Sequence, residues 1–384
     1  MLAALATQPA TRFSFTAERN LFLKALLHTQ NIVERRNTVP ILANVLVKNS
    51  GGLLSLTATD MDLDIVEGVP SVECSDGATT LPVHMLCDIV RKLPDGSQIT
   101  LKSDGDRAEL VCGRSQFTLP CLPVEDFPVI GQGNLPHSFS MPVADLKELI
   151  DHTKFAMSTE ETRYFLNGLF FHVAVDGESQ ENVLRIVATD GHRLAQAQVP
   201  LPEGAAEIPA VIIPRKTVVE LRKLLDEVNE PITIGLSQNK ISFAFSGVRL
   251  TSKLIDGTFP DYKKVIPQNN DKILTVNTKA FAEAVDRVAT ISTDKIRAIK
   301  LHITSSQITL TAAGADSGRA QEELETVYGG QTLEIGFNSR YLLDIIAQIQ
   351  TERTSLALSD VAAPTIVTEP NSTDALYVIM PMRV

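Results

Sequence analysis

The chain repeats one amphipathic helix pattern three times, and this repeat constrains its fold more than any other feature. In each copy, apolar side chains recur at spacings of three and four residues, which is the period of one helix face. The copies comprise Leu86, Ile89, Val90 and Leu93; Val218, Leu221 and Leu225; and Leu342, Ile345, Ile346 and Ile349. Ile89 precedes Leu221 by 132 residues, and Leu221 precedes Ile345 by 124 residues. Spacings of this size match a domain.

A second helix pattern and several strand patterns recur with the same period. Six helices are expected at 17–36, 84–93, 142–163, 214–227, 277–297 and 339–353. Strand-like runs between paired helices lie at 41–48 and 53–60, 167–175 and 183–190, and 298–304 and 307–312. Further runs lie at 98–103 and 109–119, 232–236 and 240–254, and 355–359 and 375–380. The repeat predicts three α+β domains at 11–136, 137–261 and 262–384, with 1–10 as a disordered extension.

Composition excludes several classes of protein. The 384 residues are 44% hydrophobic, which is typical of a globular protein. Neither a membrane-spanning run nor a basic, apolar signal peptide is recognisable, so we expect a cytoplasmic protein without a membrane partner. Free thiols are expected at Cys74, Cys87, Cys112 and Cys121, because they show no metal-ligand spacing. No cofactor or metal is expected.

The net charge of −11 argues against a protein that coats nucleic acid, but the charge is unevenly distributed. The six predicted helices carry 19 Lys and Arg against 16 Asp and Glu, a net charge of +3. The remaining residues therefore carry a net charge of −14. This distribution suggests an assembly whose helices share a mildly positive surface.

Two acidic segments offer the best candidates for catalysis and for metal binding. Thr189-Asp190-Gly191-His192-Arg193 places an acid beside a histidine, and Asp60-Met61-Asp62-Leu63-Asp64 clusters three carboxylates. Because Asp60 and Asp190 end equivalent strands in two repeats, a structural role in a turn is favoured over catalysis. A metal-dependent or acid–base hydrolase built on Asp190 and His192 remains an alternative. So does a tandem-repeat adaptor with no role on DNA.

Five motifs resemble those of bacterial sliding clamps, the beta subunit of DNA polymerase III. They are Arg163-Tyr164-Phe165-Leu166-Asn167-Gly168, Ala188-Thr189-Asp190-Gly191-His192-Arg193-Leu194, Pro214-Arg215-Lys216, Asp256-Gly257-Thr258-Phe259-Pro260-Asp261-Tyr262 and Tyr377-Val378-Ile379-Met380-Pro381-Met382-Arg383-Val384. The resemblance covers roughly residues 11–384. It implies two helices packed on antiparallel sheets in each domain, and a head-to-tail homodimer that closes a six-domain ring around duplex DNA. It implies a processivity factor rather than an enzyme.

The resemblance also implies contacts with DNA and with protein partners. The implied DNA contacts are Arg36, Tyr164, Phe165, Arg215 and Lys216, with Phe165 where relatives often carry a second tyrosine. The implied partners are the replicative polymerase catalytic subunit, the clamp loader and other proteins with a clamp-binding motif. Their cleft would comprise Leu166, Thr189, Gly191, His192, Arg193, Leu194, Pro260, Val265, Asn338, Tyr341, Val378, Met380, Pro381, Met382 and Arg383. Ile296 stands near its edge, where some relatives place an aromatic residue.

The dimer interface is expected between the acidic strand of domain three and two strands of domain one. By analogy with the family, the interface residues are Arg107, Arg114, Leu119, Ile291, Glu322, Glu323 and Glu325. The two arginines supply the charge complement to the glutamates. Ile291 is expected to pack near Leu119.

Overall fold

The computed structural model describes residues 13–131, 133–292, 297–314 and 318–383. The predicted extension at 1–10 and the position of Ile296 lie outside the described residues. The chain divides into two compact units, which are described separately. Unit 1 contains residues up to 143 together with 219–253, and unit 2 contains 144–218 together with 254–384. No helix among the described residues is both long and apolar enough to cross a membrane.

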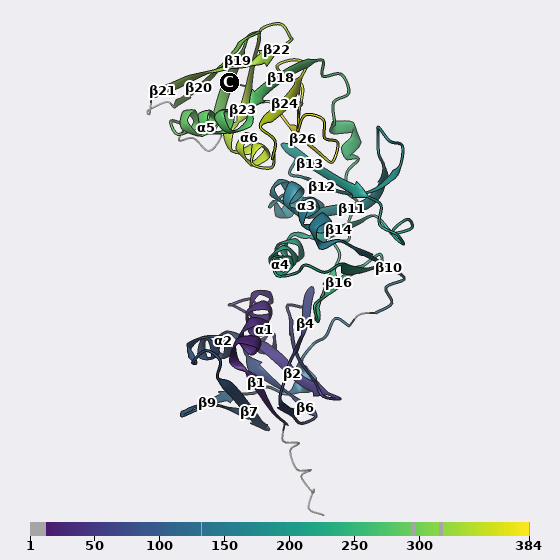
Figure 1. The fold of residues 1–384 in the computed structure, drawn as a ribbon, viewed down its shortest axis with the longest axis vertical. Helices are drawn as coiled ribbons and strands as arrows, with labels where there is room; N and C mark the ends of the chain where they lie inside the picture. The colour runs from purple at the N-terminus through teal and green to yellow at the C-terminus, as the bar shows by residue number, and fades with distance from the viewer. Residues whose placement is uncertain (1–12, 132, 293–296, 315–317, 384) are drawn as a thin grey trace, which may run out of the picture. The chain divides into compact units, whose positions relative to one another are not determined.

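Unit 1 contains two antiparallel sheets and two complete helices (Figure 1). The five-stranded sheet has the order β5 (Glu73–Cys74), β1 (Phe13–Glu18), β7 (Gln98–Asp104), β8 (Arg107–Cys112) and β9 (Ser115–Pro120). The eight-stranded sheet has the order β10 (His137–Met141), β15 (Ile232–Leu236), β16 (Lys240–Phe245), β17 (Val248–Lys253), β4 (Leu63–Val69), β3 (Leu53–Thr59), β2 (Asn44–Ser50) and β6 (Gly77–Pro82). Helices α1 (Arg19–Ile32) and α2 (Val83–Lys92) contact each other through buried apolar faces. Short 3-10 helices occupy Pro40–Ala43 and Val124–Asp126.

Unit 2 has the same construction. Its nine-stranded sheet has the order β14 (Val211–Pro214), β11 (Gly168–Val175), β12 (Asn182–Thr189), β13 (Arg193–Pro200), β26 (Ala375–Ile379), β25 (Thr365–Thr368), β24 (Arg353–Leu358), β18 (Lys272–Asn277) and β22 (Val327–Tyr328). Its four-stranded sheet has the order β21 (Gly318–Glu325), β20 (Gln307–Gly314), β19 (Ala298–Ile303) and β23 (Leu333–Asn338). The helices are α3 (Val143–Thr153), α4 (Arg215–Leu225), which runs across the division between units, α5 (Thr278–Ala289) and α6 (Ser339–Ile346). Its 3-10 helices are Lys154–Ala156, Glu161–Leu166 and Tyr262–Val265.

The order of elements confirms the threefold repeat. Each third of the chain runs strand, helix, three strands, a further strand, helix and three strands, with β5 and β22 as small additions. Strands from different thirds also pair in the same way twice. β17 pairs with β4 inside unit 1, and β26 pairs with β13 inside unit 2. In both junctions, the last strand of one repeat joins the fourth strand of the repeat before it.

The predicted helices begin where expected but end too late. The helix predicted for 17–36 ends at Ile32, that for 142–163 at Thr153 and that for 339–353 at Ile346. In α3, the hydroxyl of the last residue, Thr153, donates to the carbonyl of Leu149, one turn earlier, at 2.7 Å. The chain then continues through 3-10 turns.

Two runs that the sequence pattern treated as continuous are hairpins. Run 109–119 breaks at Gly113, which has a φ of 57°. Run 240–254 breaks at Ser246-Gly247, with φ values of 45° and 76°. In the second hairpin, positive φ at both central residues is typical of the tight turns that match strand twist. The strand expected from residue 41 begins at Asn44, because Ile41 lies in the 3-10 helix that starts at Pro40.

Candidate functional site

Two equivalent turns show what the repeated Thr-Asp pair does. The carboxylate of Asp190 accepts hydrogen bonds from the backbone N–H groups of His192 at 2.9 Å and Arg193 at 3.0 Å. In unit 1, the carboxylate of Asp60 accepts from Asp62 at 2.9 Å and Leu63 at 2.7 Å. Each carboxylate therefore closes a turn between two strands. This geometry confirms the structural interpretation of both aspartates.

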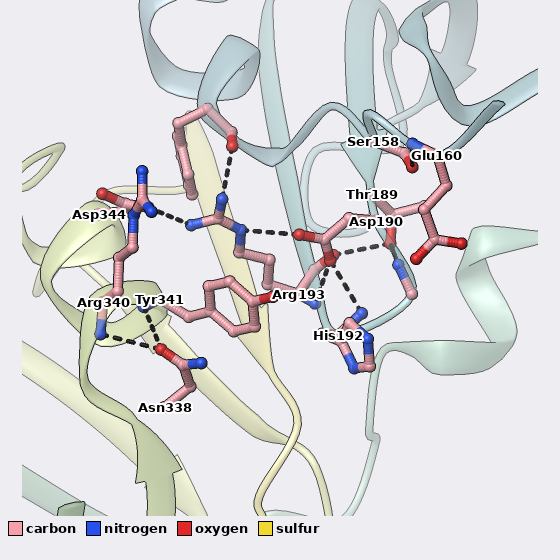
Figure 2. Close-up of polar contacts among 12 residues, drawn as sticks. Ser158, Glu160, Thr189, Asp190, His192, Arg193, Asn338, Arg340, Tyr341 and Asp344 are labelled. Carbon is pink, nitrogen blue, oxygen red and sulfur yellow. Dashed lines mark hydrogen bonds and ion pairs between the residues drawn. The ribbon is translucent and has the colours of Figure 1, made fainter. Parts of the chain in front are cut away.

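Arg193 is the centre of a group of side chains in unit 2 (Figure 2). Its guanidinium donates to Asp190 at 3.1 Å, to Asp344 of α6 at 2.5 Å and to the carbonyl of Phe155 at 2.8 Å. It also lies over the ring of Tyr341, 4.5 Å from the ring centre. Because its charge is satisfied by two carboxylates and one carbonyl, Arg193 holds β13 against α6.

A cap and an aromatic stack position Tyr341. The side chain of Asn338 accepts from the N–H groups of Arg340 at 3.0 Å and Tyr341 at 3.3 Å, so it caps the N-terminus of α6 (Figure 2). The imidazole of His192 stacks on the Tyr341 ring, with ring centres 6.0 Å apart and planes 20° apart. His192 thus faces an aromatic ring, while the Asp190 carboxylate binds backbone and Arg193. The hydrolase alternative has no acid–base pair here.

The C-terminal segment lies beside this group. Met380 donates its backbone N–H to the carbonyl of His192 at 2.9 Å, and Met382 donates to the carbonyl of Gly336 at 2.9 Å. The β26 ladder ends at Ile379, directly before these residues. Met380 is 38% exposed, and Pro381 and Met382 are half-buried. A flexible thioether in such a position can adapt its shape to different apolar side chains.

The structure divides the predicted cleft into an accessible and a buried part. Gly191, His192, Pro260, Val265 and Arg383 are exposed, whereas Leu166, Leu194 and Val378 are at most 4% exposed. These three pack in one apolar cluster with Val187, Ile212, Phe259 and Tyr262. Thr189 is half-buried and accepts from the Gly191 N–H at 3.1 Å. The buried residues are part of the apolar core that lies beneath the exposed ones.

The predicted DNA contacts fall into two groups. Arg36 is exposed in unit 1. In unit 2, Tyr164 is 52% exposed, and its ring meets the edge of Phe165 with centres 5.7 Å apart. Arg215 is exposed at the start of α4, and Lys216 follows it, half-buried. A Cβ added to Gly257 would lie 3.1 Å from Phe165, so this glycine allows the aromatic pair to pack closely.

The predicted dimer residues lie on or beside two edge strands. β9 ends the five-stranded sheet of unit 1, and β21 ends the four-stranded sheet of unit 2. Arg107 and Arg114 are exposed next to β9, while Leu119 is only 2% exposed. Ile291 is half-buried after α5. On β21, Glu323 and Glu325 are exposed, but Glu322 is half-buried and makes a bidentate ion pair with Arg287.

Sequence reasoning missed Asp344 and Phe155, the residues that hold Arg193. One signal was present, because Asp344 lies three residues after Tyr341 and so on the same face of α6. Phe155 gave no signal, since its contact is made by its backbone carbonyl and by its ring, 5.1 Å from the guanidinium.

Comparisons with known proteins agree with this architecture. Family models of the DNA polymerase III beta subunit match its N-terminal domain at 13–131, its central domain at 140–261 and its C-terminal domain at 263–383. The beta sliding clamp of Caulobacter vibrioides is 50% identical over 372 residues, covering 96% of this chain and 99% of that protein. The beta sliding clamp of Escherichia coli K12 is 38% identical over 370 residues, with the same coverage.

Solved structures give the same result. A sliding clamp from Bartonella birtlesii, crystallised with griselimycin, matches with a TM-score of 0.94 and 48% identity. The match covers 97% of this chain and all of that one. The clamp of Caulobacter crescentus matches with a TM-score of 0.93, the same identity and the same coverage. The chain therefore belongs to the DNA polymerase III beta subunit family, the sliding clamps, and is a processivity factor rather than an enzyme.

Proposed function

We propose that two copies of the chain close head to tail into a ring of six domains, with domain boundaries near residues 136 and 261. The ring encloses duplex DNA in the cytoplasm and slides along it without reading its sequence. It tethers the replicative polymerase catalytic subunit, the clamp loader and other proteins with a clamp-binding motif. Topology rather than affinity keeps the ring on DNA.

The observation that carries this proposal is the way strands of different repeats already pair. The last strand of the second repeat joins the fourth strand of the first, and the third repeat joins the second in the same way. The last strand of the first repeat, β9, and the fourth strand of the third repeat, β21, each form an edge of their sheet. Unpaired edges are templates for pairing with another chain. Joining β9 of one copy to β21 of the other repeats the same junction, and such head-to-tail contacts can close a ring.

The two existing junctions also predict the register of the third. Phe117 and Leu250 are equivalent, since each lies two residues after the first paired residue of its hairpin, Ser115 or Val248. Tyr377, like them, lies opposite a buried residue of the strand before it. Ile65, Ala195 and Ala320 are equivalent, since each lies opposite the alanine that follows Thr57, Val187 or Thr311. The observed junction pairs are Leu250 with Ile65 and Tyr377 with Ala195. The third pair is therefore Phe117 with Ala320 of the other copy.

This register agrees with the charges near the two edges. It places Arg114 opposite Glu323, an exposed glutamate whose carboxylate accepts from Gln307 in the same chain. It also places the aromatic ring of Phe117 against an alanine, as at the Tyr377–Ala195 pair. Of the predicted interface residues, Glu322 is already engaged by Arg287 and so contributes less charge to a partner.

Contacts with DNA are proposed for Arg36, Tyr164, Phe165, Arg215 and Lys216. Cationic side chains bind phosphates by a contact that is independent of sequence, which is compatible with sliding. Phe165 carries no hydroxyl, so it contributes packing under Tyr164 rather than a hydrogen bond to phosphate. The predicted excess of positive charge on the helices supports the same assignment.

Partner binding is proposed at the cleft around His192, Arg193, Tyr341, Met380 and Met382. The apolar floor formed by Leu166, Leu194 and Val378 suits leucine and phenylalanine side chains of a short peptide. Methionine on the rim permits several peptides to use one groove. Deleting 380–384 should abolish binding of polymerase and loader while leaving the dimer intact, as gel filtration would show. Persistent binding would contradict the cleft assignment.

Retention on DNA tests the ring directly. The protein is loaded by its clamp loader and ATP onto a nicked circular plasmid, and free protein is removed by gel filtration. We expect the loaded protein to stay on the circle and to leave when a restriction enzyme linearises it. A plasmid linearised but blocked at both ends by bound protein is the control, and should retain the clamp. Equal retention on open linear and circular DNA would exclude a ring, and a monomer with no retention would favour the adaptor alternative.

A further inference from the structure

A large cavity with a mixed polar and apolar lining lies in unit 2, on the same strands as the proposed cleft. It has a volume of about 830 Å³ and lies over β12, β13, β25 and β26, between the segments 175–178, 263–268 and 369–373. Its size is sufficient for several residues of a peptide. Most of its lining belongs to no site described above.

Three long polar side chains form the floor of this cavity, and two of them have their hydrogen bonds satisfied. The guanidinium of Arg185 donates twice to the amide oxygen of Gln198, at 3.0 and 2.6 Å, and to Tyr262 at 3.3 Å. The amide nitrogen of Gln198 donates to Asp176 at 2.7 Å. Gln198 therefore links a buried cation to a buried carboxylate, and this network is complete within the chain.

Gln196 is the third of these side chains, and its hydrogen bonds are not satisfied. Its side chain is on the same face of β13 as Gln198, and the residue is only 9% exposed. Its amide oxygen is buried and has no hydrogen-bond partner, and among the described residues its side chain forms no hydrogen bond at all. Buried polar groups are nearly always paired with protein groups, water or a ligand, so the amide of Gln196 is able to bond a polar group that enters the cavity.

The chemistry of the amide points to the class of ligand. A primary amide offers one acceptor and a donor side by side, which match the N–H and C=O groups of an extended polypeptide backbone. The apolar side chains of Val175, Ile266 and Leu376 also line the cavity. A polypeptide segment uses both kinds of contact. A simple anion would meet three carboxylates, those of Asp176, Glu178 and Glu369, against the two cations Arg185 and Lys263, and Arg185 is already bonded to Gln198.

The position of Gln196 indicates which polypeptide. Gln196 lies opposite Leu376 in the β13–β26 ladder, and two residues along the same face Leu194 lies opposite Val378. Two residues of a strand span about 7 Å. Leu194 and Val378 belong to the floor of the partner cleft, and Leu376 and Ile266 pack against that same cluster. The cavity is thus continuous with the cleft floor.

We propose that this cavity, through Gln196, binds the extended backbone of the partner segment that flanks the motif seated in the cleft. The inference rests on the proposed cleft function and extends it. The cleft recognises the short motif. The cavity adds affinity for partners in which the segment beside the motif lies along β13 and β26, over Leu376. The same protein can then distinguish partners that share one motif.

Peptide titrations test this proposal. Fluorescence anisotropy compares a short synthetic peptide that carries only a Leu/Phe-bearing motif with peptides that add about five residues before or after it. One of the longer peptides should bind the wild-type protein about fivefold more tightly than the short one. In Gln196→Leu this gain should disappear, while the affinity for the short peptide is unchanged. Gln238→Leu, which alters an exposed glutamine of unit 1, should behave as wild type.

Each other outcome is informative. If neither longer peptide binds more tightly, the cavity inference fails while the cleft stands. If Gln196→Leu weakens short and long peptides equally, Gln196 acts only on the shape of the cleft and the inference is overturned. If the short peptide does not bind the wild-type protein, the cleft assignment itself fails, and the inference with it. Because the Gln196 amide has no partner to lose, the leucine variant should retain the thermal midpoint, which checks that it is folded.

Discussion

The guanidinium of Arg193 and the carboxylate of Asp344 lie 2.5 Å apart, although the two residues are 151 positions apart in the chain. This contact ties the turn that follows β12 to helix α6. The side chain of Arg193 is 10% exposed and that of Asp344 is 36% exposed, so the pair is partly shielded from water. A charge-assisted hydrogen bond in this setting contributes more than an ion pair on an open surface.

Asp344→Asn should therefore lower the free energy of unfolding by about 1 kcal/mol. The loss of the charge weakens the bond to Arg193, and relief of the unfavourable helix-dipole contact near the end of α6 offsets only part of that loss. Urea denaturation measures the change. The matched control is Asp62→Asn, since the Asp62–Lys253 pair has side chains 80% and 51% exposed and should contribute less than about 0.5 kcal/mol. Equal effects of the two variants would contradict the proposed difference in shielding.

Gly168 ends the motif that starts at Arg163, and its backbone approaches β14 closely. A Cβ at this position would lie 2.2 Å from the carbonyl oxygen of Ile213. Gly168→Ala should lower the free energy of unfolding by roughly 3 kcal/mol, because the contact is with backbone that cannot rotate away. Gly177→Ala is the control, since a Cβ added there would have no neighbour within 4 Å and the φ of Gly177 is not positive. Thermal unfolding of both variants measures the difference, and a stable Gly168→Ala protein would refute the close approach.

The repeat was enough to predict the number of domains, the six helices and most strands. Each of these features depends on local periodicity, which a sequence displays directly. Helix ends and tight turns were harder to predict from the sequence. No glycine or proline marks the end of α3 at Thr153, and the hairpin at Ser246-Gly247 depends on positive φ values. Neither interrupts the hydrophobic pattern.

Site residues were predicted by resemblance to a family, and a resemblance does not predict whether each side chain is buried or exposed. Leu194 and His192 are neighbours in one motif, yet the first is 3% exposed and the second is exposed. His192 lies in the turn before β13, whereas Leu194 lies within β13 and is buried where that strand pairs with Val378 of β26. That pairing joins segments far apart in the chain. Asp344 was missed for the same reason, because its place on the same helix face as Tyr341 does not by itself show that α6 packs beside the turn at Asp190.

His28 gives one junction between repeats a dependence on pH. Burial lowers the pKa of His28, but the hydrogen bond to Glu67 at 2.8 Å and the nearby Glu227 carboxylate together raise the pKa above its usual value. Glu227 also pairs with Lys24 at 2.6 Å. A raised pKa means that protonated His28 stabilises the folded state. This stabilisation is fully present below about pH 6.5 and is lost as pH rises through the folded pKa.

His28→Gln should therefore destabilise the protein more at pH 6 than at pH 8.5, by roughly 1 kcal/mol. Urea denaturation at the two pH values measures the difference. Glu67→Gln should reduce the same pH dependence, because it removes the nearest carboxylate from the imidazole. A His28→Gln effect that is equal at both pH values would show that His28 stays neutral throughout.

The register predicted for the dimer can be tested by cross-linking. If Phe117 lies opposite Ala320 of the other copy, then Gln116 lies opposite Gln321, with both side chains on the face away from the Phe117 ring. Directly opposed residues of antiparallel strands have Cα atoms about 4.5–5.5 Å apart, which is within the range of a disulfide. Gln116→Cys combined with Gln321→Cys should give a covalent dimer under mild oxidation, seen on non-reducing gels. Gln116→Cys combined with Glu323→Cys is the matched control, since the two-residue offset separates the Cα atoms by about 7–8 Å. Wild-type protein controls for Cys74, Cys87, Cys112 and Cys121, which are free thiols. Cross-linking of the offset pair in preference to the aligned pair would show that the junction between copies does not follow the register of the two junctions within the chain.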